Sequence, residues 1–294
     1  HETLIDYPEI GIQLIASLNT DKDKLLENVK INIQRRELMR VWPCAPQSQD
    51  SVLAIVAGGP SLLDTLDELR DVIESGAKVV SLANATHLLL EHGITPSAQV
   101  ILDAKPRNAE FLFDLPGCTY FLASQCDPSV FEKALSFSQM NGYTEVTAKE
   151  NEQRVMLWNA VNNDEELEAV MNLGEAWVPV QSGSTITLRA LRLFQILGYY
   201  KFHMFGFDSC MMDGKHHAYP QPMADDQRRA EITCNGRVFE VAGWQINQAM
   251  EFEKFVKLFG GEADNEMSLQ MVIHGDGLIA HMVRSIVPSV DTAA

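Results

Sequence analysis

The sequence predicts an α/β protein with a Rossmann-like, doubly wound, mostly parallel sheet that carries helices on both faces. Three observations predict this fold. Short apolar runs alternate with helical patterns from Ser51 onward. The runs are rich in β-branched residues and nearly free of charge, as strands buried on both faces are. Small or polar residues follow the runs, at the edge where parallel sheets bind their ligands.

Residues 1–48 are expected to form an N-terminal helical arm. Leu25, Val29, Ile33 and Leu38 recur near helical spacing, and charged residues fill the other face. The apolar stripe suits packing against the main domain or against a second copy of the chain, so the arm is a candidate homo-oligomer contact. Residues 43–50 have the composition of a linker. The second domain therefore spans residues 49–294.

The first element of this domain is a strand over 51–57, followed by Gly58-Gly-Pro-Ser61 and a helix over 62–75. Glycines let the backbone turn sharply and approach a ligand. A proline followed by a serine begins a helix whose free N–H groups and dipole attract anions. Gly58, Gly59, Pro60 and Ser61 are therefore predicted to bind phosphate. The alternative is a plain strand-to-helix turn, because the motif is neither a dinucleotide fingerprint nor a Walker loop.

Two further strands, over 78–83 and 97–102, end at Asn84 and Asp103. A short helix over 88–92 lies between them, and a fourth strand is expected over 118–123. Residues 127–172 contain a helix near 128–135 and then an irregular polar stretch. We expect this segment to be a lid-like excursion from the domain.

Regular alternation returns with a short strand over 176–180 and a helix over 186–197. Between them lies a second turn of small residues at a helix N-terminus, the same physical arrangement as the first. Ser182, Gly183 and Ser184 are therefore predicted to bind phosphate together with the first turn.

The last part of the chain begins with a strand over 201–207 that ends at Asp208. A polar segment containing His217 and Tyr219 follows and is expected to lie as a loop over the strand ends. A strand over 236–242, a helix over 244–258, a strand over 268–273 and a final helix complete the prediction.

Composition excludes several classes of protein. The formal charge of −17 and the lack of a basic run argue against nucleic-acid binding. Five cysteines without a Cys-x-x-Cys pair indicate neither a disulfide framework nor a zinc ribbon. No run is long enough to span a membrane, and no signal-peptide pattern opens the sequence. We therefore expect a cytoplasmic protein with reduced thiols.

The landmarks at the strand ends, taken in order, resemble a known family. They are Ala57-Gly-Gly-Pro-Ser-Leu62, Gly93-Ile-Thr-Pro-Ser97 leading to Asp103, Gln181-Ser-Gly-Ser184, Leu197-Gly198, Phe205-Gly-Phe-Asp208 and His217-Ala-Tyr219. From Val52 to the C-terminus they resemble the archaeal 6-hydroxymethylpterin diphosphokinase-like (MptE-like) domain, which is also the core of the motility accessory factor (Maf) flagellin glycosyltransferases. More loosely, they are similar to the small bacterial sialyltransferases.

The resemblance implies that residues 49–294 form a nucleotide-binding transferase domain with a nucleotide-activated donor in its crevice. It places the phosphate on the two small-residue turns, and Asn84 where sialyltransferase-like proteins have a donor-contacting asparagine. One departure concerns catalysis. Small sialyltransferases have a histidine base shortly before the helix that matches 244–255, whereas this sequence has no histidine near Val241.

His217 is then the candidate catalytic base, because an imidazole on a loop can reach an acceptor hydroxyl and transfers protons near neutral pH. A histidine that only structures the loop is the alternative. His274 is a weaker candidate, whereas His87 and His92 are expected to be structural. Tyr219 is a candidate to orient the leaving phosphate. The alternative is that it only packs in the core.

Asp103 and Asp208, at two strand ends, are candidate ligands for Mg²⁺ with the donor phosphates. Without metal they would cap turns or bind a ribose or base, so no cofactor is predicted with certainty. Asp208 is also a candidate catalytic residue. Trp158, Trp177 and Trp244 show no spacing of a carbohydrate platform and are expected in the core.

Three functions follow. The first is a glycosyltransferase that uses a nucleotide-sugar donor and an acceptor that the sequence does not identify. The second is an ATP-dependent 6-hydroxymethylpterin diphosphokinase. The absence of a lysine from the phosphate loop disfavours ATP, although Lys105 and Arg107, which follow Asp103, could serve instead. The third is a catalytically silent nucleotide-binding or assembly module.

Overall fold

A nearly continuous parallel sheet forms the centre of the protein. The computed structural model describes residues 21–36, 38–137, 154–161, 167–168, 178–220, 229–259 and 269–286. Across the sheet the strands lie in the order β1 (Met39–Arg40), β6 (Val155–Ala160), β5 (Thr119–Ala123), β4 (Ala98–Ile101), β3 (Lys78–Leu82), β2 (Leu53–Val56), β8 (Lys201–Phe205) and β11 (Gln270–Ile273), and β7 (Pro179–Val180) pairs with β6. Every pairing in this sheet is parallel. The predicted fold class is confirmed.

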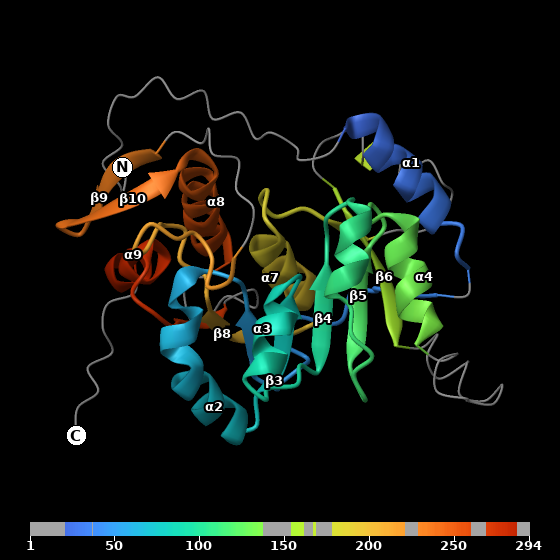
Figure 1. Cartoon of the computed structure of the whole chain (residues 1–294), viewed down its shortest axis with the longest axis horizontal. Coiled ribbons are helices and arrows are strands. Elements are labelled where there is room, and N and C mark those ends of the chain that lie inside the picture. The colour runs from blue at the N-terminus through green and yellow to red at the C-terminus, as the bar shows by residue number, and fades with distance from the viewer. Residues whose placement is uncertain are drawn as a thin grey trace.

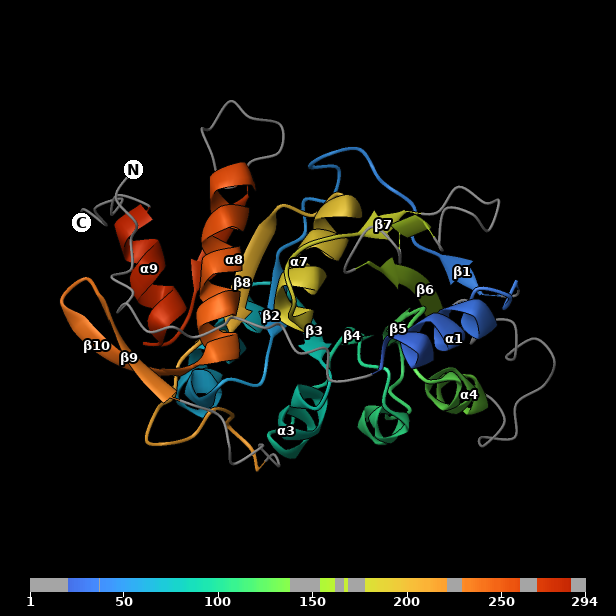
Figure 2. The same cartoon turned by 90° about the horizontal axis from the view of Figure 1, so that it is seen from above.

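Helices cover both faces of the sheet (Figures 1 and 2). One face carries α2 (Leu66–Glu74), α3 (Ala85–Glu91) and α4 (Pro128–Ser136), and the other carries α7 (Ile186–Ile196), α8 (Gly243–Phe259) and α9 (Leu278–Ile286). Short 3₁₀ helices, η1 (Pro60–Thr65) and η2 (Pro106–Phe111), follow β2 and β4.

Strand β2 shows why both faces need helices. All four of its residues are buried. Because side chains alternate along a strand, Ala54 and Val56 pack with the apolar side of α2 and α3, whereas Leu53 and Ile55 join the cluster that contains Leu188 of α7. An apolar run without alternation is therefore the sequence signature of this central position.

The order of the strands reverses next to β2. From β2 the chain proceeds through β3, β4, β5 and β6 on one side and then returns to place β8 on the other. Val56 and Phe205 are partners at the carboxyl ends of β2 and β8. Their following loops are joined, since the N–H of Gly59 donates to the carbonyl of Gly206 at 2.8 Å. This is the topological switch point, where such sheets bind ligands.

The segment expected as a lid-like excursion, residues 127–172, contains α4 and β6. The prediction is wrong for 155–160, because β6 pairs with β5 inside the sheet and four of its last five residues are buried. Trp158 is 1% exposed in this strand, which confirms its place in the core. Residues 138–153, 162–166 and 169–177, including Trp177, lie outside the described residues.

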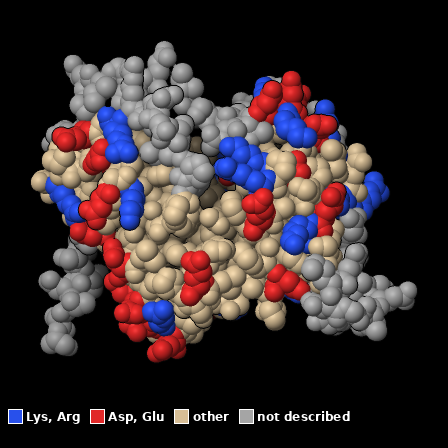
Figure 3. All heavy atoms as spheres, viewed as in Figure 1, with Lys and Arg blue, Asp and Glu red and all other residues tan. Residues whose placement is uncertain are grey.

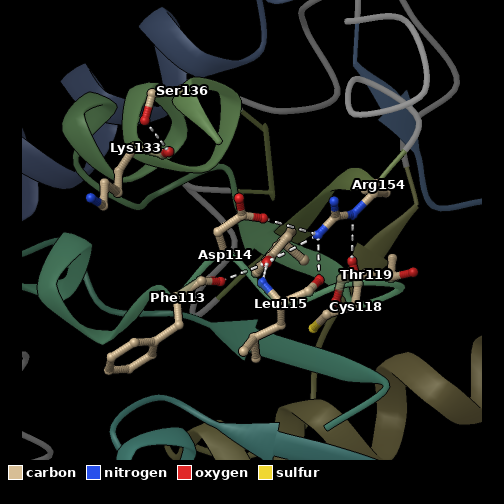
Figure 4. A network of polar contacts seen from close by, with 9 residues as sticks. Phe113, Asp114, Leu115, Cys118, Thr119, Lys133, Ser136 and Arg154 are labelled. Carbon is tan, nitrogen blue, oxygen red and sulfur yellow. Dashed lines mark hydrogen bonds and ion pairs between the residues drawn. The ribbon is translucent and has the colours of Figure 1, made fainter. Parts of the chain in front are cut away.

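A polar network at the amino ends of β5 and β6 fixes this pairing (Figure 4). The guanidinium of Arg154, just before β6, donates to the carbonyls of Leu115 at 2.6 Å and Cys118 at 3.0 Å. Tyr120 of β5 donates its hydroxyl to the carbonyl of Phe113 at 2.6 Å. Because a buried carbonyl without a partner is costly, the network stabilises the turn that enters β5.

The N-terminal helix α1 (Lys22–Asn32) confirms the helix that was expected there. It lies against the end of β5, because Asn28 donates to the carbonyl of Gln125 and Asn32 to those of Ser124 and Cys126. Val29 belongs to the main hydrophobic cluster. The described part of the arm is thus packed on the sheet, and the division at residue 48 stays a prediction.

Beyond the sheet, β9 (Arg229–Cys234) and β10 (Arg237–Ala242) form an antiparallel hairpin that leads into α8. The sequence prediction included β10 and missed β9. Among the described residues, no helix is both long and apolar enough to cross a membrane.

Candidate functional site

One cavity lies at the switch point and collects most of the predicted site. Its walls come from the loops after β2, β3, β4 and β8, the first turn of α7, the 216–219 loop and the start of α8. It is lined by Gly58, Gly59, Pro60, Asn84, Asp103, Asp208, His217 and Tyr219 from the predicted set, together with Arg107, Phe111, Thr185, Ile186, Thr187, Trp244, Gln245 and Gln248 among others. The strand-end argument therefore located the cavity.

A second cavity, of about 270 Å³, lies near the amino ends of β8 and β11. It is lined mainly by apolar groups, with Arg192 as its charged residue. Among the described residues, neither a carboxylate nor an imidazole lines it. The switch-point cavity combines both with free backbone N–H groups, so it is the candidate functional site.

The glycine turn is roofed by the 216–219 loop. The N–H of Ala218 donates to the carbonyl of Gly58 at 3.0 Å, and a Cβ on Gly58 would overlap the ring of Tyr219. A Cβ on Gly59 would overlap the carbonyl oxygen of Gly206 and the carboxylate of Asp208. Both glycines are thus required for close packing, which is the structural reason for Gly-Gly at this turn.

Asp208 is buried, with 3% of its surface exposed. Its Oδ2 accepts the N–H of Ser61 at 3.0 Å. Burial raises the pKa of Asp208, the hydrogen bonds from Ser61 oppose the rise, and Asp64 adds to it. Gly277 leaves no room for a Cβ beside this carboxylate. Asp208 therefore caps the helical turn after Gly59 and ties β8 to β2, and its carboxylate is largely withdrawn from the cavity.

His217 is half-buried on the roof of the cavity. Burial and the neighbouring His216 lower the pKa of His217 to about 4, so the ring is neutral at pH 7 and keeps a lone pair. Its Nδ1 is buried and has no hydrogen-bond partner among the described residues. The rings of Tyr219 and Trp244 lie 5.4 and 6.4 Å away, centroid to centroid.

Tyr219 stays protonated in this packing, because burial raises its pKa to about 12. Its ring also packs against the apolar cluster under α2 and α3. Tyr219 is thus a packing residue, and its packed ring also holds the hydroxyl, a hydrogen-bond donor, beside Gly58.

The loops after β3 and β4 form another wall. Asn84 begins α3, and its amide makes no capping hydrogen bond. Ala83 before it has φ of 46°, an uncommon conformation for a residue other than glycine. Such backbone strain concentrates at functional sites.

Asp103 is exposed to solvent at the cavity, yet protein crowds it enough to raise its pKa, and Lys105 and Arg107 oppose the rise. Because Asp208 is buried and engaged, Asp103 is the one carboxylate among the described lining residues that is open to the cavity. The described residues contain no group of three or more His, Cys, Asp or Glu suited to a metal. The shared Mg²⁺ site therefore stays a hypothesis with one accessible carboxylate.

The second small-residue turn lies differently from the prediction. The carboxylate of Glu251 in α8 accepts the N–H of Ser184 at 2.8 Å and its hydroxyl at 2.9 Å. Neither Ser182, Gly183 nor Ser184 lines the cavity. An internal carboxylate thus occupies the position that the sequence suggested for a phosphate.

The first turn of α7 lines the cavity instead, through Thr185, Ile186 and Thr187. The N–H groups of Ile186 and Thr187 have no acceptor among the described residues. Gln248 fixes this turn, because it donates to the hydroxyl of Thr185 at 2.7 Å and accepts from Ser209 at 2.6 Å. The helix N-terminus therefore points free donors at the cavity.

Several residues of the cavity were missed from the sequence. Trp244 was expected in the core, whereas it is 36% exposed and forms part of the cavity wall. It stands at the start of α8, close after Val241, and no histidine occupies this part of the wall. An aromatic residue in the first turn of a helix that follows a strand was the only signal available.

The remaining predicted histidines lie outside the cavity. His274 has both ring nitrogens engaged, with Glu68 and with His203. His87 pairs with Glu91 on the surface of α3. Neither is placed to act as a base in the cavity.

Residues 23–214 match the family model described as 6-hydroxymethylpterin diphosphokinase MptE-like. The fold is similar to that of the Maf glycosyltransferase from Magnetospirillum magneticum AMB-1, with a TM-score of 0.57 and 18% identity over 85% of this chain. A mammalian sialyltransferase solved with Gal-beta-1-3GalNAc-ortho-nitrophenol gives a TM-score of 0.43 at 12% identity, over 88% of this chain and 87% of its own. No curated protein matches.

This chain corresponds to 38% of the length of the Maf glycosyltransferase. At that identity the likeness shows a shared fold. The family match covers well over half of the sequence and includes β2, the glycine turn, the first turn of α7 and β8. The chain belongs to the MptE-like family.

Proposed function

We propose that this protein is a glycosyltransferase that binds a nucleotide-sugar donor in the switch-point cavity. The observation that carries the proposal is the convergence of unpaired donors on one neutral imidazole. The N–H groups of Ile186 and Thr187 line one wall, and His217 lies on the roof. The membership of the family and the Maf-like fold support a transferase.

The donor's phosphate would lie against the first turn of α7, where the N–H groups and the helix dipole stabilise negative charge. Arg107 is the cation of the cavity lining and would contact the same group. When the bond between the sugar and the phosphate breaks, these donors stabilise the charge that the nucleotide retains. They are fixed before the reaction, so no reorganisation is required at that moment.

His217 would take the proton of the acceptor hydroxyl as its oxygen bonds to the sugar. A neutral ring is the form that can do so. Tyr219, beside Gly58, would donate its phenolic hydrogen to the departing phosphate. Asp208 would act as a positioning residue through Ser61.

The charges on the surface fit a small anionic ligand rather than a polyanion. In Figure 3 acidic and basic side chains are interspersed on this face, and acidic ones gather over α2, which carries Asp67, Glu68, Asp71 and Glu74. A nucleic acid would be repelled by the net charge of −17. The donor would be attracted by local N–H groups instead.

The first experiment is a thermal-shift panel of CMP, UDP, GDP and ATP and their sugar conjugates, followed by turnover of the binding donor in wild type and His217→Gln. Donor affinity should stay within about twofold, and transfer should fall by about 10²-fold or more, the usual contribution of a general base. His92→Gln, at the end of α3, is the matched control. Unchanged transfer in His217→Gln would remove His217 as the base, and no response in the panel would refute the nucleotide site.

The second candidate is ATP-dependent diphosphate transfer to a hydroxymethylpterin, which the description of the family favours. Asp103 would then hold Mg²⁺ with the ATP phosphates. A thermal shift with ATP that requires Mg²⁺ would select this reaction. Binding without turnover of any donor would instead favour a silent nucleotide-binding module.

A further inference from the structure

His274 lies at the centre of a polar chain that joins three elements. Its Nδ1 is 2.5 Å from the carboxylate of Glu68 in the first turn of α2, and its Nε2 is 2.9 Å from Nδ1 of His203 in β8. The ring stacks on Phe205, with centroids 4.0 Å apart and planes 9° apart. The His274 side chain is 11% exposed, whereas that of Glu68 is 56% exposed.

This chain of contacts is adjacent to the glycine turn but outside the cavity. His274 ends β11, and the next residue, Gly275, approaches Ser61 so closely that a Cβ there would lie 2.5 Å from the serine oxygen. Gly277 packs on Asp208 in the same way. On the other side, Glu68 belongs to α2, which follows η1 (Pro60–Thr65). His274 therefore connects the loop that packs on Ser61 with the helix that continues from η1.

The hydrogen-bond pattern allows one proton to be added without breaking a contact. A carboxylate only accepts, so Nδ1 of His274 carries a hydrogen. In neutral His274, Nε2 accepts from Nδ1 of His203; in protonated His274, Nε2 donates to it and His203 changes tautomer. Burial lowers the pKa of His203, and the neighbouring His274 lowers it further.

Other carboxylates near His274 interact with groups other than its ring. In its own turn, Asp276 is paired with Arg237 of β10 and with His281 of α9. Behind Gly275, the carboxylate of Asp208 is engaged by Ser61, and Asp64 of η1 lies near Asp208. Glu68 is consequently the carboxylate that responds to a proton on His274.

We propose that His274 is a positioning residue that clamps the Gly58–Ser61 loop between α2 and β11, and that a proton on its ring tightens the clamp through Glu68. The inference rests on the proposed function only where it assumes that this loop contacts a nucleotide. The clamp itself is a property of the free protein.

The test is hydrogen–deuterium exchange of the ligand-free chain, followed in peptides that cover 56–66, at pH 5.5 and pH 8. An imidazole gains its charge between about pH 5 and 8. After correction for intrinsic exchange, wild type should be better protected at the lower pH by about threefold, the scale of a partly exposed ion pair. His274→Gln replaces the imidazole by a polar side chain that cannot gain a charge and should lose this pH dependence.

Glu68→Gln tests the same point on the surface, where the substitution leaves the core intact. It should lose the pH dependence as His274→Gln does. His87→Gln removes an exposed histidine–glutamate pair inside a single helix and is the matched control, which should retain it. Wild-type protection that does not vary with pH, or pH dependence that persists in Glu68→Gln, would overturn the proposal.

A second measurement separates this inference from the proposed function. CMP and UDP affinity is measured by titration calorimetry for wild type and Glu68→Gln at both pH values. If wild type binds the nucleotide about threefold more weakly at pH 8 than at pH 5.5, and Glu68→Gln shows no such difference, the clamp acts on a nucleotide site. If exchange responds as predicted and none of CMP, UDP, GDP and ATP binds in the same titration, the clamp stands and the nucleotide site fails.

Discussion

The two small-residue turns look alike in the sequence and differ in the structure. Each precedes a helix, and each has an N–H that is taken by a carboxylate from a distant element: Ser61 by Asp208 and Ser184 by Glu251. The first turn nevertheless lines the cavity, through Gly58, Gly59 and Pro60, whereas the second lies outside it.

The difference teaches what a helix N-terminus can predict. Local sequence determines that N–H groups point outward together, because the helix leaves them without partners. Which acceptor they meet depends on residues that are far away in the sequence. At α7, the internal acceptor Glu251 takes the N–H of Ser184, and the donors left for a ligand are two and three residues further along, at Ile186 and Thr187.

The largest expected contrast is between Gly59→Ala and Gly183→Ala. The first places a methyl group on the backbone oxygen of Gly206 and on Asp208, neither of which can move freely, so we expect a loss of about 3 kcal/mol. The second meets the flexible side chains of Leu188 and Glu251, although φ of 65° disfavours alanine, so about 1 kcal/mol is expected. Urea denaturation measures both, and equal losses would refute the contrast.

Nucleotide affinity should also respond to substitutions in the cavity lining and not to substitutions in the second turn. Asn84→Ala removes an amide that lines the cavity and should weaken binding of the responding nucleotide by about tenfold, the effect of one hydrogen bond to a charged group. Ser182→Ala, outside the lining, should leave the affinity unchanged. Titration calorimetry compares the two, and a loss in Ser182→Ala would return the second turn to the binding site.

Much of the fold could be predicted from the sequence because its signals are local. The runs at 53–56, 78–82, 98–101 and 201–205 are short and mostly apolar, and such runs between helical patterns are strands of a buried parallel sheet. Strand β6 carries the same signal, in Val155-Met-Leu-Trp-Asn-Ala160, but polar sequence on either side made it look like part of a loop. Its partner, β5, is far enough away in sequence that only the sheet itself reveals the pairing.

The candidate site was predictable to the extent that strand ends define it. Gly58, Asn84, Asp103 and His217 all line the cavity. Trp244 and Glu251 come from α8, whose position against α7 depends on tertiary packing rather than on any motif. Sequence reasoning therefore found the residues at the strand ends and on the 216–219 loop. It missed the wall of the cavity that α8 provides.

Glu251→Ala tests whether the second turn can bind an anion once its internal carboxylate is removed. Loss of the carboxylate removes a cap from Ser184 and should cost about 1 kcal/mol of stability. The uncovered N–H should then bind inorganic phosphate, so that phosphate stabilises the variant against heat more than it stabilises wild type. Glu251→Gln keeps an acceptor and serves as the control. An equal response of Glu251→Ala and wild type to phosphate would contradict this interpretation.

The smallest effect concerns the charge at the first turn. Burial raises the pKa of Asp208 in the folded protein, so its contribution to stability is complete below its unfolded-state pKa and is lost as the pH rises through the folded-state pKa. At pH values above the folded-state pKa, wild type therefore holds an unfavourable buried charge. Asp208→Asn removes that charge and offers Ser61 an amide oxygen in place of the carboxylate. We expect a higher urea midpoint than that of wild type at pH 7 and a shrinking advantage toward acid.

Glu251→Gln makes the matching substitution at the second turn. Because Glu251 is only half-buried, the change in its urea midpoint reports mainly the loss of a capping charge and little of the cost of burial. If Asp208→Asn is less stable than wild type at pH 7, the hydrogen bond to Ser61 outweighs the cost of burial. The carboxylate would then be required as an anion, and the two turns would be more alike than their burial suggests.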